Sequence, residues 1–172
     1  AKEFVKKKQQ DSESKEKEVK LKEQEKEKRI EQKQLAKERI PVIAKSLLEC
    51  KQGTITIDNI TMELAGSGKA NFCYSTSDNY DDVFHIGLGE ALCKADPKLV
   101  YCGLFEQGEK IRAIVYAGED ISKEKSAGEI VKRISQILGG AGGGSPKFAQ
   151  GGGIDKSKKE DAIKNAKSMI IE

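Results

Sequence analysis

Polar residues dominate the first 40 positions of the chain, and apolar residues return only toward the end of this stretch. Lys, Glu and Gln are good helix formers, and Glu16 and Lys20 stand four residues apart, a spacing at which opposite charges meet on a helix surface. The pattern predicts a helical arm over residues 1–50 that is solvated along most of its length and packs only through its last turns.

Two features of this arm complicate the pattern. Its apolar residues do not keep a heptad spacing through three repeats, so dimerisation through residues 19–49 is possible but weakly encoded. Pro41 lacks a backbone N–H and disfavours helical conformation at Ile40, which predicts a kink or break before a short helix that ends at Cys50. The apolar residues of the segment are Val19, Leu21, Ile30, Leu35, Ile40, Ile43 and Leu47.

After position 50, short apolar runs alternate with helical patterns. The predicted strands cover residues 54–57, 59–64, 71–75, 99–105 and 111–116, the last two joined by a hairpin connection at 106–109. A helix capped by Asp78 or Asn79 is expected between the third and fourth strands. This order is typical of an α/β domain, which we expect over residues 51–172 as a small mixed sheet flanked by helices. The first two strands of the body, 71–75 and 99–105, should be parallel.

A glycine-rich segment, Gly139–Gly153, separates the last two helical patterns and reads G-G-A-G-G-G-S-P-K-F-A-Q-G-G-G. The helix before it, residues 127–138, ends where Gly139 can serve as the C′ residue, and Ser157 and Glu160 are spaced as a capping box for the helix after it. Both helices have an apolar stripe that must pack in a hydrophobic core, which fixes the two ends of the segment between them. We therefore expect an ordered loop with a shaped backbone surface; a flexible linker is the alternative. The two apolar stripes are Ala127, Ile130, Val131, Ile134, Ile137 and Leu138, and then Ala162, Ile163, Ala166, Met169 and Ile170.

Charge is distributed unevenly along the chain. Residues 41–131 hold 9 Lys and Arg against 14 Asp and Glu, whereas residues 132–172 hold 8 against 4. A basic end centred on the glycine-rich segment favours a polyanionic partner, although such charge runs also make merely solvated surfaces. The cations in question are Lys132, Arg133, Lys147, Lys156, Lys158, Lys159, Lys164 and Lys167.

No pattern indicates catalysis, a cofactor or a metal. Residues 66–69 lack the first glycine and the Ser/Thr of a phosphate-binding P-loop, and the glycines of 87–89 lie inside a predicted helix, where they should permit close packing. His85 is the single histidine, and we expect it to point away from the apolar face of its helix, which leaves no zinc site. The four cysteines have no C-x-x-C spacing and predict buried thiols.

The ends of the chain suggest its setting. No signal sequence opens it and no apolar run reaches about 18 residues, so a soluble cytoplasmic protein without membrane contact is expected. The first residue, Ala1, lies inside a charged helical pattern without an initiator Met, which indicates that a larger chain was cut here.

The glycine-rich segment resembles the C-terminal signature of alanyl-tRNA synthetases. In that signature a glycine run is followed by a basic or polar residue, Pro, two variable residues, Ala-Gln and further glycines, here with Pro146, Ala149 and Gln150. DHH-type phosphoesterases share the domain but carry a Gly-Gly-His variant, and no His occurs here. The chain departs from the family at Ser145, where many members have Arg, which leaves Lys147 as the one cation of the segment.

This resemblance implies a module that binds the tRNA elbow and so supports aminoacylation and editing, as a fragment of an alanine–tRNA ligase with no catalytic centre of its own. The rest of the synthetase chain and the tRNA would then be its partners. Phe148 is expected either to extend a platform for the tRNA or to anchor the segment in the core, and Gln150 to brace the loop. The implied RNA-binding residues are Gly142, Gly143, Gly144, Pro146, Lys147, Phe148 and Gln150, with Lys132, Arg133 and Lys158 supplying salt-sensitive attraction.

Two other functions remain open at this point. The chain can be the nucleotide- or nucleic-acid-binding domain of a DHH-type phosphoesterase, with a phosphate in the glycine-rich segment. It can also be a non-catalytic dimerisation or interaction module whose helical arm contacts the partner.

Overall fold

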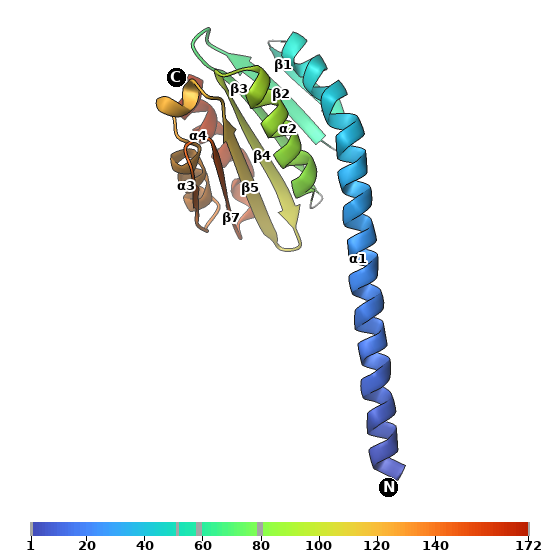
Figure 1. Ribbon diagram of the computed structural model, residues 1–172. Coiled ribbons are helices and arrows are strands. Elements are labelled where there is room, and N and C mark those ends of the chain that lie inside the picture. Colours follow the sequence, from blue (N-terminus) through green and yellow to red (C-terminus); the bar gives the residue numbers. More distant parts are fainter. Residues whose placement is uncertain (1, 51, 58–59, 79–80, 172) are drawn as a thin grey trace. The chain divides into compact units, whose positions relative to one another are not determined.

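The computed structural model describes residues 2–50, 52–57, 60–78 and 81–171, and it has a mixed α/β fold (Figure 1). The elements in chain order are α1 (Lys2–Glu49), β1 (Gly53–Ile57), β2 (Ile60–Gly66), β3 (Asn71–Ser77), α2 (Asp82–Ala95), β4 (Leu99–Gln107), β5 (Lys110–Ala117), α3 (Ala127–Ile137), β6 (Gly142–Gly144), β7 (Phe148–Gly153) and α4 (Lys159–Ile171). Short 3₁₀ turns, Ile121–Lys123 and Lys156–Lys158, precede α3 and α4. The fold class expected from the sequence is confirmed. Within the described ranges, no helix combines the length and the apolar character needed to cross a bilayer.

By its contacts the chain divides into two units, residues 1–35 and 36–172, so the end of α1 belongs to the body. The sequence predicted a kink or a break at Pro41, and the break is wrong, because α1 continues through this residue. A proline inside a helix costs about 3 kcal/mol. Ile40, Ile43 and Leu47 flank Pro41 and are buried in the body, and burying each such side chain stabilises by roughly 1.5–3 kcal/mol, which offsets that cost.

The seven strands form one sheet in the order β1-β2-β3-β4-β5-β7-β6. β3 and β4 are parallel, as expected, because α2 carries the chain back across the sheet between them. The other neighbouring strands are antiparallel. The β4–β5 connection turns at Gly108, whose φ of 60° suits a glycine.

Two helix starts differ from expectation. α2 is capped by Asp81, whose carboxylate accepts a hydrogen bond from the Phe84 N–H at 3.1 Å, and neither Asp78 nor Asn79, which lies outside the described residues, is its N-cap. The capping box of Ser157 and Glu160 does not form, because Asp155 caps the preceding 3₁₀ turn and accepts from the Ser157 N–H. In both cases the Asp directly before the first turn accepts a hydrogen bond from a backbone N–H that has no partner within the helix.

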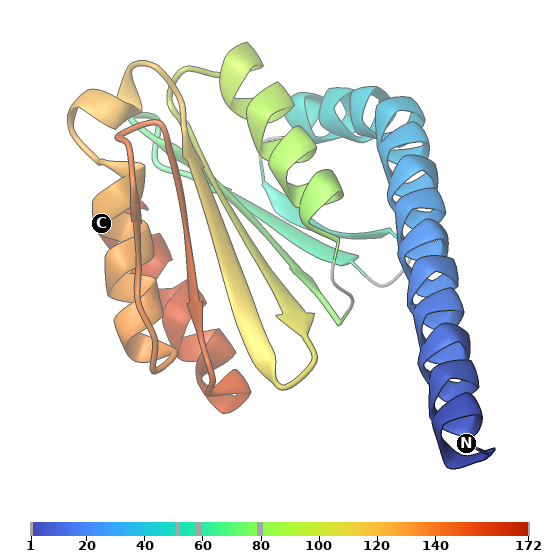
Figure 2. The same cartoon turned by 60° about the horizontal axis from the view of Figure 1, so that its bottom comes forward.

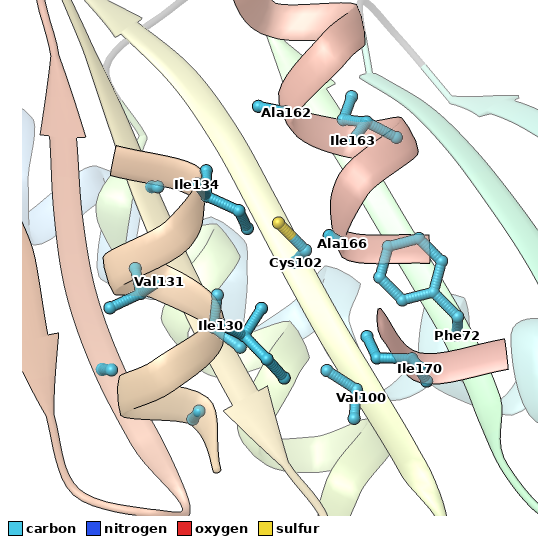
Figure 3. Close-up of a cluster of buried hydrophobic side chains, with 14 of the residues drawn as sticks. Phe72, Val100, Cys102, Ile130, Val131, Ile134, Ala162, Ile163, Ala166 and Ile170 are labelled. Carbon is cyan, nitrogen blue, oxygen red and sulfur yellow. The ribbon is translucent and has the colours of Figure 1, made fainter. Parts of the chain in front are cut away.

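Helices cover both faces of the sheet (Figure 2). α3 and α4 pack on one face, and Figure 3 shows their apolar stripes meeting side chains of β3 and β4 such as Phe72, Val100 and Cys102. α2 and the last turns of α1 cover the opposite face. The expected stripes of α3 and α4 are confirmed, and Cys73, Cys93 and Cys102 are buried, so three of the four thiols lie in the core as predicted.

His85 corrects the sequence analysis, because it lies fully buried between α2 and β4 instead of facing away from the core. Its ring stacks on Phe105 with centroids 4.9 Å apart, and Gly103 makes room for it, since a Cβ there would lie 2.7 Å from Nδ1. Nδ1 lies 2.9 Å from both Ser75 Oγ and Tyr101 Oη, whereas buried Nε2 has no partner among the described residues. The buried face of α2 consists of Phe84, His85, Leu88, Gly89, Leu92 and Cys93.

Burial of His85 makes the stability of the folded protein sensitive to acid. Desolvation lowers the pKa of His85 to about 4 from an ordinary value near 6.5. The unfolded chain therefore binds a proton at His85 more readily than the folded chain does. The stability that the neutral, buried ring contributes is present above about pH 6.5 and is lost as the pH falls toward 4. We expect the free energy of unfolding to drop by about 2 kcal/mol between pH 7 and pH 5. Urea unfolding at both pH values checks this; His85→Gln should remove most of the difference, and an equal drop in the variant would contradict the assignment.

Candidate nucleic-acid interface

The glycine-rich segment, which the sequence predicted to be an ordered loop, forms a β-hairpin. β6 and β7 pair antiparallel, with Gly143 opposite Gln150, and β7 adds to β5 with Gln150 also opposite Ile114. The segment is therefore ordered by backbone ladders on both sides of β7, and the flexible-linker alternative does not describe it. Glycine has a low strand propensity, which is why the residue pattern alone did not reveal these strands.

Carbonyl groups fix the turn of the hairpin, residues 145–147. The Pro146 carbonyl accepts from the Ala127 N–H at 2.8 Å, and the Lys147 carbonyl accepts from the Ala117 N–H at 2.9 Å. Ser145 closes the turn, because its N–H donates to the Phe148 carbonyl and its Oγ accepts from the Phe148 N–H. With their carbonyls bound inward, Pro146 and Lys147 present exposed side chains to solvent.

Ser135 holds the other end of the hairpin and was missed in the sequence. Its fully buried hydroxyl accepts a hydrogen bond from the Gly152 N–H at 3.1 Å, and its carbonyl accepts from the Gly140 N–H at 2.8 Å. Gly139 has a φ of 77° and ends α3 as the expected C′ residue. A serine next to an apolar helical stripe is a weak signal, but a hydroxyl in such a position needs a polar partner once it is buried.

Packing explains most of the glycines, with one informative exception. A Cβ at Gly142 would lie 2.7 Å from both Ser135 Oγ and the Gly151 Cα, and one at Gly144 would lie 2.6 Å from the Ala149 Cα. A Cβ at Gly143 would meet nothing within 4 Å, and this residue is exposed. The fold therefore requires Gly142 and Gly144 but makes no such demand at Gly143.

Alternation along the strands separates the residues of the hairpin onto two faces. Ala149 packs in the core that α3 covers, so Phe148 and Gln150 face the opposite side. The Phe148 ring contacts Tyr116 with centroids 4.5 Å apart and is half-buried, which supports an anchoring role while leaving part of the ring exposed. The side chain of Gln150 is exposed, so this residue supports the hairpin through its backbone pairing. We call Gly143, Phe148 and Gln150 the outer face of the hairpin.

The predicted cations do not all gather at this face. Lys132 and Arg133 are exposed on α3, whose buried side packs on the opposite face of the sheet. Lys158 forms an ion pair with Asp161 at 3.8 Å, and Lys147 stands at the hairpin turn. The structure thus brings Lys147 and the outer face together and places the other three cations elsewhere. Within the described ranges, no three His, Cys, Asp or Glu side chains converge as a metal site would require.

Comparison with known proteins places these features in a family. A family model described as the DHHA1 domain matches residues 69–172. An alanine–tRNA ligase of Nitrosopumilus maritimus is 43% identical over 169 residues, which are 98% of this chain and 18% of that relative. An alanine–tRNA ligase of Cenarchaeum symbiosum is 41% identical over 92 residues, 54% of this chain and 10% of the relative. The chain thus spans less than a fifth of either ligase.

A solved structure supports the same assignment. The C-Ala domain from Aquifex aeolicus alanyl-tRNA synthetase aligns with a TM-score of 0.60 and 25% identity, covering 64% of this chain and all of that domain. The resemblance first seen in the glycine-rich segment therefore extends to the fold of the body and to most of the sequence. The chain belongs to the DHHA1 domain family, in the form found at the C-terminus of alanyl-tRNA synthetases.

Proposed function

We propose that this chain is the tRNA-binding C-terminal module of an alanine–tRNA ligase and that the outer face of its hairpin contacts the tRNA elbow. Aminoacylation and editing of tRNA(Ala) would be carried out by the whole ligase, with this module holding the tRNA. The observation that carries the proposal is Gly143, an exposed glycine that the fold does not require, on the edge strand β6, which is held by its pairing with β7. The relatives named alanine–tRNA ligase support the same partner.

The chemistry of the elbow matches such a surface. RNA is recognised largely by shape and by its exposed bases and phosphates, and the elbow presents the flat face of a tertiary base pair. A strand with no side chain at Gly143 lets that flat face approach the backbone closely, while the exposed part of Phe148 adds an apolar edge beside it. Gln150 supplies an exposed amide that can donate or accept a hydrogen bond.

The cations contribute unequally to this proposal. Of the four cations predicted from the sequence, Lys147 is the one that belongs to the hairpin, where it lies in the turn. Lys132 and Arg133 lie in another layer, so we propose for them a long-range attraction that salt screens. Lys158 adds less, because Asp161 already neutralises it in part.

Glycine substitutions test the contact directly. We expect Gly143→Ala to leave the free energy of unfolding within about 0.5 kcal/mol of the parent, since its Cβ points into open space. The same change should weaken tRNA binding about 10-fold, because the methyl group holds the base plane off the backbone. Gly142→Ala is the control, and its clash with Ser135 and Gly151 should cost about 1–3 kcal/mol of stability. Thermal unfolding measures the stability of each variant, and fluorescence anisotropy measures its affinity for tRNA. Unchanged affinity in Gly143→Ala would refute the contact.

Lys147 and the elbow can be tested together. The parent chain should bind intact tRNA more tightly than an acceptor-stem minihelix or a DNA duplex of similar charge, because only the intact tRNA has an elbow. Lys147→Glu should weaken tRNA binding and reduce the slope of log affinity against log salt by about 1. Equal binding of the three nucleic acids would sink the elbow assignment, and an unchanged salt slope would remove Lys147 from it.

The arm offers a second candidate function, which is dimerisation of the ligase. Residues 10–35 are described as helix with almost entirely exposed side chains, including Val19, Leu21, Ile30 and Leu35. Ile40, Ile43 and Leu47 are buried within the body, so a dimer through residues 19–49 would use the first four. Deletion of residues 1–35 should convert a dimer to a monomer in sedimentation velocity without lowering the stability of the body. A mass that the deletion leaves unaltered would remove the arm from any dimer.

A further inference from the structure

The hairpin borders a shallow cleft at the end away from its turn. Its lining includes Lys110 and Arg112 of β5 and the backbone of Gly152 and Gly153 of β7. The cleft has a volume of about 210 Å³, below the roughly 300–1,000 Å³ of pockets that enclose a small molecule. Its size suits a compact charged group better than a whole nucleotide.

The two cations of this cleft, Lys110 and Arg112, are not neutralised by an acidic side chain among the described residues, whereas nearby Lys156 is. Over the described stretches of the chain, neither Lys110 nor Arg112 forms an ion pair. Lys156, near the same end of β5, pairs with Glu106 at 3.7 Å and donates to the Gly108 carbonyl. The charge that remains uncompensated in the cleft is therefore positive, and it comes from two adjacent positions on one face of β5.

The glycine wall leaves these cations accessible. A Cβ at Gly152 would overlap the Ile111 carbonyl, and one at Gly153 would overlap the Leu138 carbonyl, so the fold itself requires both glycines. The consequence is a wall of bare backbone beside Lys110 and Arg112. An anion can approach the guanidinium of Arg112 there without displacing a side chain from β7.

The cleft and the outer face of the hairpin share one side of the sheet. Arg112 lies opposite Gly152, Ile114 opposite Gln150 and Tyr116 opposite Phe148, and residues two apart on a strand face the same way. Arg112 and Tyr116 are four residues apart, which is about 14 Å along the strand. Cations thus stand at both ends of the outer face, Lys110 and Arg112 at one and Lys147 at the other.

We propose that this cleft binds a backbone phosphate of the RNA that contacts the hairpin, with Arg112 as a two-pronged donor and Lys110 as a point charge. A guanidinium matches the geometry of two phosphate oxygens, and an ammonium adds attraction without fixed geometry. The assignment rests on the proposed tRNA binding. It adds a phosphate contact to the one proposed for Lys147, on the same side of the sheet and about 14 Å along β5 from Tyr116.

Three charge-removing variants of the full chain test it: Lys110→Gln, Arg112→Gln and, as a matched control, Lys164→Gln. Lys164 is exposed on α4, which covers the other face of the sheet. Affinity for tRNA is measured by anisotropy over a series of salt concentrations, with thermal unfolding to verify each fold. We expect Lys110→Gln and Arg112→Gln each to weaken binding about 3- to 10-fold and to lower the salt slope by about 1. Lys164→Gln should change both quantities less.

The outcomes separate the cleft from the function on which it rests. If the parent binds tRNA more tightly than the DNA duplex but all three variants match one another, the cleft assignment is overturned and the proposed function stands. If the parent shows no preference for tRNA, the proposed function fails first. Because Lys110 is exposed, its variant remains a valid test even if Arg112→Gln loses stability.

Discussion

The close approach of glycine-rich main chain to its neighbours on both sides is the constraint on which the rest of this structure depends. β7 lies in the sheet between β5 and β6, and the backbone of Gly151 sits so near Ser135 of α3 that a Cβ would overlap its hydroxyl. The hydrogen bond from the Gly152 N–H to Ser135 Oγ depends on the same proximity. Bulkier residues would lift the hairpin from α3 and open the core around Ala149, so composition and architecture at this edge cannot be changed independently.

Much of the body could be predicted because its elements follow simple periodicities. The apolar runs of β4 and β5 and the 3.6-residue stripes of α3 and α4 are local patterns, and a helical connection through α2 is typical of two parallel strands such as β3 and β4. The continuation of α1 past Pro41 could not be predicted in this way, because it depends on burial of Ile40 and Leu47 against the body, which is a tertiary effect. The helix propensity of proline gives the free-energy cost of Pro41 in the helix, but it does not include the tertiary packing that outweighs this cost.

The candidate site was predictable in composition but not in geometry. The glycine run indicated a backbone surface, yet its strands depend on pairing with β5, which no glycine pattern encodes. Charge counting grouped Lys132 and Arg133 with Lys147, although the sheet separates their layers. It also overlooked Arg112, because this residue lies in a predominantly buried strand and in a segment of net negative charge. Only the register opposite Gly152 reveals its place beside the hairpin.

Rigidity is what makes a side-chain-poor surface useful for recognition. A flexible glycine tract would lose roughly 1–2 kcal/mol of backbone conformational entropy per residue on ordering at an RNA surface. In this hairpin the ladders, the Ser145 turn and Ser135 have already met that cost during folding. A surface ordered in advance gains more from each weak contact with a flat base pair, so affinity can come from stacking and a few phosphates. The same reasoning explains why Gly143 is the informative residue: its neighbours hold the strand still, and it alone among Gly142, Gly143 and Gly144 is released from packing to meet a partner.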